Sequence, residues 1–502
     1  MRQLAPLAVL GTFAAFLFSR TTGNLAIKLD DVYYLSQSYA GTGGYLGTMA
    51  SRGYLTRSYG WLHQLLGRNT QHDHLFFFAL LIVSAIIVWH ILRGLLDERA
   101  ALVGAMFHLG YAGRMEIVDW VSAGGYLVLL IVFLVSVKIA IVPQWNPWAK
   151  GLAITAINWP AVHLYEILMV AAPLYPALLI MEARQSGRRL KGSALAASLL
   201  PMAMFLVHWV LLYTGKPDRP IWVRHEGWME GPHALAASIW NALWLGTSST
   251  FGHVHAAYVL LRLQDFLYTP VSFWMLAAAT ATVAACILYW RTAPAAQPGD
   301  RKAYWLMAAA AFYLVVPANL ITFPVVTNHF DSRLLTLPGT GVALLAALAV
   351  ARVGILRPGW RRPIIAGLFA VLSLEAIAFN TVLCVDELNW SFDSGVRKQI
   401  ADSGWRFHPE GGVFISMPHK HPRWGARRVG QQTWESGAGR LILLLDSGQL
   451  GNERSGFGYL WERRPPSDQV SLPVVSAGKP LLPFLVRQSD YRLVPIEHEE
   501  AR

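Results

Sequence analysis

The sequence predicts an all-α membrane protein, a polytopic bundle of about eleven transmembrane helices with interfacial helices and a small C-terminal α/β domain. Only 14% of the 502 residues are charged, against about 25% in ordinary globular proteins. Apolar residues make up 54% of the chain and its mean hydropathy is +0.38. A bilayer accepts the apolar outer surface that would form sticky patches in water. This composition excludes a disordered chain, a fibrous repeat and a soluble enzyme.

The charge is distributed unevenly, which predicts two domains. Residues 385–502 contain 15 Lys or Arg and 14 Asp or Glu, whereas the much longer segment 1–384 contains 27 and 16. We therefore expect a membrane domain at 1–384 and an aqueous α/β domain at 385–502, with strands at GGVFISMP, RLILLLD and YRLVPIE. The two cysteines, Cys286 and Cys384, lie in apolar runs and are interpreted as packing residues.

Apolar runs of suitable length predict the transmembrane passes, since a spanning helix needs about 20 such residues. The eleven candidate runs are 4–22, 75–96, 100–114, 119–142, 149–163, 166–182, 193–214, 271–291, 303–323, 338–355 and 363–384. The first run carries one Arg and no clear cleavage site, so we interpret it as a pass rather than a signal peptide.

Basic residues predict the orientation. A cytoplasmic N-terminus places 16 of the 27 basic residues before position 385 on the cytoplasmic side, as the positive-inside rule requires. Segment 148–183 has Lys150 at one end and the basic cluster RQSGRRLK just beyond the other, so two short passes should meet near Val162–Glu166. The odd count places the C-terminal domain outside the cytoplasm, in a multi-pass protein of the cell (inner) membrane. The net charge of +12 is then explained by the basic cytoplasmic loops. We expect no nucleic-acid partner.

The predicted outer loops carry the unusual polar residues. The pair Asp30 and Asp31 follows the first pass directly, in LDDVYYL, and segment 42–68 fits one or two amphipathic helices in the interface. Adjacent carboxylates at a membrane surface repel each other and are costly to desolvate, although a pair of helix-capping residues would explain them equally well. Further loops contribute Arg114, Glu116 and Asp119; His163, Tyr165 and Glu166; the Trp-rich stretch 222–244; and His329, Asp331 and Arg333.

This plan resembles the GT-C superfamily, the polytopic glycosyltransferases that use polyprenyl-phosphate sugars, of the protein mannosyltransferase and lipid A aminoarabinose transferase type. The resemblance rests on LDDVYYL after the first pass, EIVDWVS as a second acidic site, and RLLTLP before a later pass. It implies that Asp30 is the catalytic base with Asp31 beside it, that Asp119 is the second acid, and that Arg333 contacts the phosphate. Relatives often keep a Lys where this chain has HLYE, so His163, Tyr165 and Glu166 are candidate site residues there, as is His329 in a later loop.

The expected chemistry needs a base for the acceptor hydroxyl and positive charge at the departing phosphate. Asp30 is the candidate base, and Arg333 or Arg114 can supply forked hydrogen bonds to the phosphate. The expected partners are a polyprenyl-phosphate sugar donor, a lipid, glycan or protein acceptor, and membrane lipids.

Several alternatives remain open at this stage. Glu375 lies within a pass, where we expect a structural hydrogen bond inside the bundle. The histidine-rich stretches at 71–74, 253–255 and 419–421 have no specific metal spacing, so no cofactor is assigned and a divalent metal stays possible. A transporter or flippase of lipid-linked glycans would show repeat symmetry, of which no clear sign is found, and a surface-polysaccharide polymerase or ligase would share the donor chemistry.

Overall fold

The computed structural model describes most of the bundle and parts of the C-terminal region. The described residues are 4–23, 25, 31, 53–143, 145–162, 164, 166–185, 192–215, 231–293, 301–322, 332–353, 358–402, 412–418, 458–464, 481–486 and 493–495.

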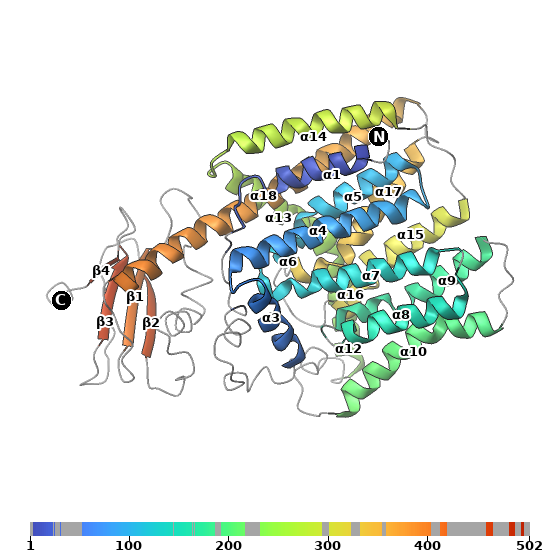
Figure 1. The fold of residues 1–502 in the computed structure, drawn as a ribbon, viewed down its shortest axis with the longest axis horizontal. Coiled ribbons are helices and arrows are strands. Elements are labelled where there is room, and N and C mark those ends of the chain that lie inside the picture. The colour runs from blue at the N-terminus through green and yellow to red at the C-terminus, as the bar shows by residue number, and fades with distance from the viewer. Residues whose placement is uncertain are drawn as a thin grey trace.

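Long helices form the bundle, and several run side by side in alternating directions (Figure 1). They are α1 (Leu4–Leu17), α4 (Thr70–Arg93), α5 (Glu98–Gly110), α7 (Gly125–Ile141), α8 (Pro147–Val162), α9 (Leu174–Gln185), α10 (Gly192–Gly215), α14 (Phe273–Thr292), α15 (Arg301–Val315), α17 (Pro338–Val353) and α18 (Pro358–Asp402). Each of the eleven predicted runs overlaps one of these helices. Four of the described segments are long and apolar enough to cross a bilayer: Thr70–Arg93, Val121–Ile141, Phe273–Thr292 and Gly359–Ser391. This indicates a membrane protein.

Shorter helices connect the long ones. They are α3 (Gly53–Leu65), η3 (Ala112–Arg114), α6 (Glu116–Asp119), η4 (Val121–Ala123), η5 (Glu166–Ala171), α12 (Pro232–Phe251), α13 (His253–Phe266), α16 (Asn319–Thr322) and η7 (Ser332–Leu335). Helix α3 has the amphipathic character expected for segment 42–68, because Tyr59 and His63 are buried while Trp61 and Leu65 are each 65% exposed.

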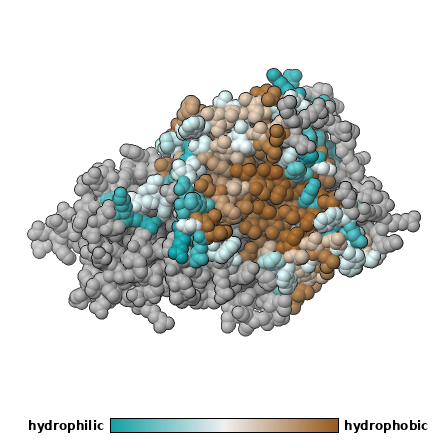
Figure 2. Space-filling model, viewed as in Figure 1, coloured by the Kyte–Doolittle hydropathy of each residue, from teal (hydrophilic) through white to brown (hydrophobic). Residues whose placement is uncertain are grey.

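The centre of the bundle is built on α5, which packs between α4 and α17. This close approach depends on Gly104, where a Cβ atom would lie 2.6 Å from the Leu92 side chain and 2.9 Å from that of Ala347. Outside this core, apolar side chains gather over the middle of the bundle and polar ones lie toward both ends (Figure 2). A surface of this kind suits a hydrocarbon layer between two aqueous phases.

Segment 148–183 doubles back on itself. Lys150, in the first turn of α8, is paired with Glu182, near the end of α9, at 2.5 Å between Nζ and Oε2, and both side chains are buried. The start of α8 and the end of α9 therefore lie together on one side of the bundle.

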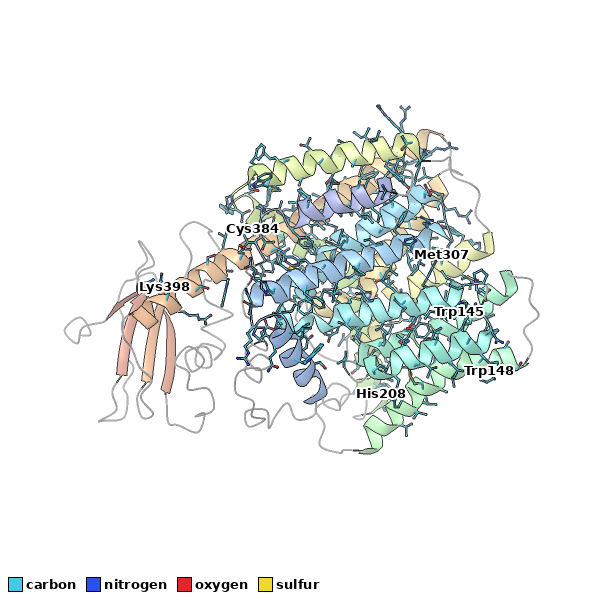
Figure 3. All side chains as sticks on the ribbon, viewed as in Figure 1. Trp145, Trp148, His208, Met307, Cys384 and Lys398 are labelled. Carbon is cyan, nitrogen blue, oxygen red and sulfur yellow. The ribbon has the colours of Figure 1, made fainter. Side chains whose placement is uncertain are left out.

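Helix α18 joins the bundle to the C-terminal region. Its 45 residues correspond to about 68 Å at 1.5 Å per residue, and Cys384 and Lys398 mark its course from the bundle toward the sheet (Figure 3). The predicted boundary at 384/385 lies inside this continuous helix. No Pro interrupts the chain between 364 and 402, so the change from apolar to polar composition does not end the helix.

Four described strands form one sheet beyond α18: β1 (Gly412–Pro418), β2 (Gly458–Arg464), β3 (Leu481–Val486) and β4 (Leu493–Pro495). Their order is β2-β1-β3-β4, with β1 parallel to both β2 and β3, and β4 antiparallel to β3. Strands β1 and β4 fall within the predicted GGVFISMP and YRLVPIE, whereas RLILLLD lies outside the described residues. The sequence interpretation missed β2 and β3.

Candidate active site

A buried connection between α5 and α7 crosses one end of the bundle. It consists of η3, α6 and η4, and every residue from Tyr111 to Gly125 is buried except the half-buried Glu116 and Trp120. Gly124 permits this, because a Cβ atom there would lie 2.2 Å from the Phe77 ring. The connection places polar backbone and side chains within the protein at the ends of apolar helices. We refer to residues 111–125 as the crossing segment.

Asp31 is attached to the crossing segment by its carboxylate. The backbone N–H of Ser122 donates to Oδ1 at 2.6 Å and that of Val121 to Oδ2 at 3.3 Å, and the Asp31 side chain is fully buried. Hydrogen bonds from backbone N–H groups to a carboxylate are charge-assisted and among the stronger ones in proteins. The chain that follows α1 is therefore fixed two to three residues away from Asp119.

Helix α3 holds the same segment from a second direction. The Tyr59 hydroxyl donates to the Ser122 carbonyl at 2.6 Å and accepts from the Gly125 N–H. One turn later, His63 Nδ1 lies 2.7 Å from Asp73 Oδ2 on α4, and both side chains are buried. Helix α3 is thus bound to the bundle by buried polar contacts as well as by its apolar face.

Asp119 is completely buried and shares its surroundings with α13. Burial raises the pKa of Tyr258 well above its ordinary value, and the negative charges of Glu116 and Asp119 raise it further, while Arg262 opposes this. Arg262 lies 4.7 Å from the centre of the Tyr258 ring and donates to Asp265 Oδ2 at 3.1 Å. Asp119 therefore acts electrostatically on a buried phenol that Glu116 and Arg262 also influence.

Charge within α13 is balanced over several side chains. Burial raises the pKa of Asp265, and Arg262 partly offsets that rise. Burial lowers the pKa of Arg262, but the charges of Tyr258, Asp265 and Asp386 outweigh it and raise that pKa overall. Arg262 is therefore a permanent cation close to the carboxylates, which is the type of group that an anionic substrate needs.

Arg114 is directed into the protein. Its guanidinium donates to the carbonyl oxygens of His108 at 2.5 Å and Thr336 at 2.8 Å, and to Thr340 Oγ1 at 3.1 Å, and the side chain is 1% exposed. These acceptors give Arg114 the role of fastening η3 to the start of α17. A phosphate contact by this residue would require these bonds to be replaced.

Several residues singled out from the sequence fall outside the described part of the chain. These are Asp30, His163, Tyr165 and His329. For Arg333 and Glu166 the backbone is described, within η7 and η5, but the side chains are not. Helix η7 packs against both η3 and α6, so the backbone of Arg333 belongs to an element that contacts the one carrying Asp119.

Glu375 forms hydrogen bonds inside the bundle, as its position in an apolar run predicted. Its Oε1 lies 2.6 Å from His255 Nε2, and its Oε2 accepts from the Ala112 N–H at 2.9 Å. His255 is also stacked on Tyr111 with ring centres 5.0 Å apart, and the Tyr111 hydroxyl donates to the Thr250 carbonyl. This network connects α13 and α18 to the crossing segment and so positions α6.

The histidine-rich stretches do not form a metal centre within the described residues, where no group of three or more His, Cys, Asp or Glu side chains could hold an ion. His74 Nδ1 contacts the Val118 carbonyl at 2.8 Å and His253 Nδ1 contacts Ser248 Oγ at 2.8 Å, so these imidazoles bind the protein. Residues 419–421 lie outside the described part.

Sequence reasoning missed Tyr258 and Arg262 as site residues. The available signal was the RLQD sequence in α13, where Arg262 and Asp265 are three residues apart on one helical face. The contribution of Arg20 was also missed. It donates to Asn380, to Thr381 Oγ1 at 2.9 Å and to Thr269 Oγ1 at 2.7 Å, and thereby joins three distant segments.

The sequence matches no model of a known protein family and no curated protein. The resemblance to the GT-C superfamily therefore stays a prediction, carried by the residues named above.

Proposed function

We propose that this protein is an integral membrane glycosyltransferase that transfers a sugar from a polyprenyl-phosphate donor to a lipid, glycan or protein acceptor. The donor's chain would lie in the bilayer and its phosphate at the surface. Such a substrate requires acidic and basic groups at the end of an apolar bundle. The observation that supports this proposal is the attachment of the Asp31 carboxylate to the Val121 and Ser122 N–H groups, next to the buried Asp119.

In this proposal Asp31 is a positioning residue and Asp30 is the catalytic base. The Asp31 carboxylate is occupied by two backbone N–H groups, which makes it a poor choice for accepting a substrate proton. Consecutive Cα atoms lie about 3.8 Å apart, so anchoring Asp31 keeps Asp30 near the crossing segment. Asp119 would stabilise positive charge that develops on the sugar.

The proposed reaction is a single displacement. Asp30 takes the proton of the acceptor hydroxyl, whose oxygen forms a bond to the anomeric carbon. The bond from that carbon to the phosphate oxygen breaks with oxocarbenium character, and polyprenyl phosphate leaves with the electron pair. The anomeric configuration is inverted. Arg333 is the candidate for the leaving phosphate, and Arg262 is a second candidate, because its charge and that of Asp119 both act on Tyr258. No step is assigned to a metal.

The proposed topology has eleven passes, a cytoplasmic N-terminus and an α/β domain outside the inner membrane. The paired ends of α8 and α9 support an even number of crossings in segment 148–183. The basic residues on the predicted cytoplasmic side support the direction. Reactivity of single cysteines, introduced in the loops of a cysteine-free chain, toward a membrane-impermeant maleimide would test each loop.

The function is tested by incubating the purified protein with a panel of radiolabelled polyprenyl-phosphate sugars and acceptor extracts. We expect transfer from at least one donor, and a loss of at least about 100-fold in Asp30→Asn if it is the general base. Asp97→Asn is the matched control, because Asp97 caps α5 at the other end of the bundle and Asn caps equally well. Full transfer by a folded Asp30→Asn protein would overturn the catalytic assignment. Absence of transfer together with movement of a lipid-linked glycan across vesicles would favour a flippase.

A further inference from the structure

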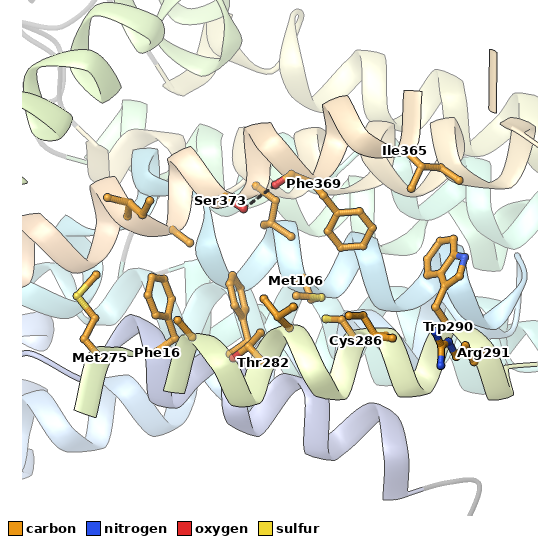
Figure 4. A pocket seen from close by; sticks show the side chains of 17 residues that line it. Phe16, Met106, Met275, Thr282, Cys286, Trp290, Arg291, Ile365, Phe369 and Ser373 are labelled. Carbon is orange, nitrogen blue, oxygen red and sulfur yellow. Dashed lines mark hydrogen bonds between the residues drawn. The ribbon is translucent and has the colours of Figure 1, made fainter. Parts of the chain in front are cut away.

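A long apolar groove runs between α14 and α18. Its volume is about 700 Å³, and α1 and α5 contribute Phe13, Phe16 and Met106 to its lining. Side chains of α14 and α18 face each other across it (Figure 4). On α14 the lining extends from Met275 to Arg291, about 24 Å at 1.5 Å per residue. The groove is long and narrow enough for one extended hydrocarbon chain.

The groove opens on the lipid-facing surface along α14. The lining residues Val283 and Ile287 are 58% and 50% exposed. Helix α14 packs along α1, and few of its residues are buried. A hydrocarbon chain could therefore enter sideways from the bilayer without opening the bundle.

The polar network of Arg20 lies beyond one end of the groove. Phe16 and Ile377 line the groove; Arg20 lies in the turn that follows α1, and Thr381 lies one turn beyond Ile377 on α18. Arg20 donates to Thr381, Asn380, Thr269 and the Pro270 carbonyl. The hydrogen bonds of this guanidinium run to α18 and to the chain before α14. They therefore hold these two segments and the turn after α1 together. A lipid headgroup would have to displace these partners to bind there.

The other end of the groove is cationic and accessible. Arg291 lines it and is exposed, next to Trp290, which lies 6.0 Å from Phe369 across the groove. Arg99 lies 5.3 Å from the Trp290 ring and donates to the Ala293 carbonyl at 3.0 Å. Arg361 and Arg362, one turn before the lining residue Ile365, are also exposed. These guanidiniums favour negative charge at this end.

We propose that the groove between α14 and α18 binds one anionic phospholipid, with an acyl chain in the groove and its phosphate at Arg291. The exposed Arg291 at this end, and the Arg20 guanidinium already bonded within the protein at the other, fix the direction of the lipid. Its headgroup lies at the opposite end of the bundle from Asp31 and Asp119, so this lipid is not the sugar donor. In the proposed topology it comes from the cytoplasmic leaflet, whose anionic lipids attract basic residues at the membrane surface.

The test is lipid binding to the delipidated, detergent-purified full chain, measured by native mass spectrometry. Phosphatidylglycerol and phosphatidylcholine with identical acyl chains are titrated separately. We expect tighter binding of phosphatidylglycerol, and Arg291→Gln should weaken it by about fivefold, equivalent to about 1 kcal/mol. Arg352→Gln is the matched control. Arg352, on α17, does not line the groove. Its guanidinium lies 3.6 Å from the centre of the Tyr304 ring.

A second pair of variants tests the location. Ala279→Phe fills the groove and should reduce binding of both lipids, whereas Ala284→Phe adds the same bulk at an exposed position of α14 that does not line the groove. Equal binding of both lipids, or an Arg291→Gln protein that keeps the preference, overturns the role of the headgroup. Unchanged binding by a folded Ala279→Phe protein overturns the location. Displacement of phosphatidylglycerol by polyprenyl phosphate would instead assign the groove to the donor and overturn the proposal.

Discussion

His255 and Glu375 are joined at 2.6 Å between Nε2 and Oε1 across α13 and α18, 120 residues apart in the chain. The second oxygen of Glu375 accepts from the Ala112 N–H, at the start of the crossing segment. One buried carboxylate thus holds three elements together. The position of the Glu375 carboxylate determines the placement of η3 and α6. In the proposed function this carboxylate does not contact the substrate.

Replacing Glu375 by Ala should cost about 2 kcal/mol of stability, because two buried donors lose their acceptor. Glu375→Gln, which keeps one acceptor oxygen, should cost less. Thermal unfolding in detergent measures both, and a double-mutant cycle with His255→Ala isolates the pair. Ser373→Ala on the same helix is the control, since that exposed hydroxyl bonds only the Phe369 carbonyl of its own helix. If Glu375→Ala unfolds at the wild-type temperature, the role given to this network is wrong.

The Lys150–Glu182 pair should show the behaviour of a buried ion pair. Lys150→Ala leaves the Glu182 carboxylate buried without its cation, and we expect a loss of about 3 kcal/mol. Lys150→Met combined with Glu182→Leu replaces both charges with apolar side chains of similar size and should recover most of that loss. Thermal unfolding of the single and double variants provides the comparison. A double variant no more stable than the single one would contradict this account.

Gly124 should tolerate no side chain. Its backbone has φ −58°, which suits any residue, so the restriction is steric: a Cβ atom would meet the fully buried Phe77 ring at 2.2 Å. Gly124→Ala should cost about 1–3 kcal/mol, and it should reduce transfer activity by moving Ser122 away from Asp31. Gly367→Ala is the control, since that helical glycine has open space around its Cβ position. Equal unfolding temperatures for the two variants would be incompatible with this packing.

Tyr258 should make the protein sensitive to alkaline pH. Its pKa is raised in the folded state by burial and by Glu116 and Asp119, so above about pH 10 the unfolded chain ionises this phenol while the folded chain keeps it neutral. The unfolded state then binds fewer protons, and stability falls as the pH rises above that value. Tyr258→Phe should lessen this fall, measured by unfolding between pH 8 and 11, whereas Phe at the exposed Tyr268 should not. Identical alkaline profiles for both variants would exclude Tyr258 as the cause.

Parts of the fold followed from local sequence, and parts did not. The helices follow from runs of apolar residues, and the turn near 162–166 follows from the basic residues around it, because charge placement across a bilayer is a property of composition. The continuity of α18 was missed because a change in polarity resembles a domain boundary. Strands β2 and β3 were missed because GYLWERR and LLPFLV lack clear alternation.

The sequence predicted the kinds of residue in the candidate site but not the contacts that each of them makes. LDDVYYL and EIVDWVS indicated acids at one end of the bundle, and the structure attaches Asp31 to the segment that follows Asp119. Partners far away in the chain decide whether a given side chain faces the substrate or packs into the protein. Arg114 looked like a phosphate ligand in sequence, yet its acceptors include Thr336 and Thr340, more than 200 residues later.

By itself the sequence determined an apolar helical chain and predicted basic residues and acids at separate ends, since hydropathy and charge act locally through the solvent. Only the tertiary structure decided that Glu116, Asp119 and Arg262 all act on Tyr258, and that Arg291 lies at one end of a groove between α14 and α18. These are contacts between elements remote in the chain. They depend on which helix faces pack together, and that is a property of the whole bundle.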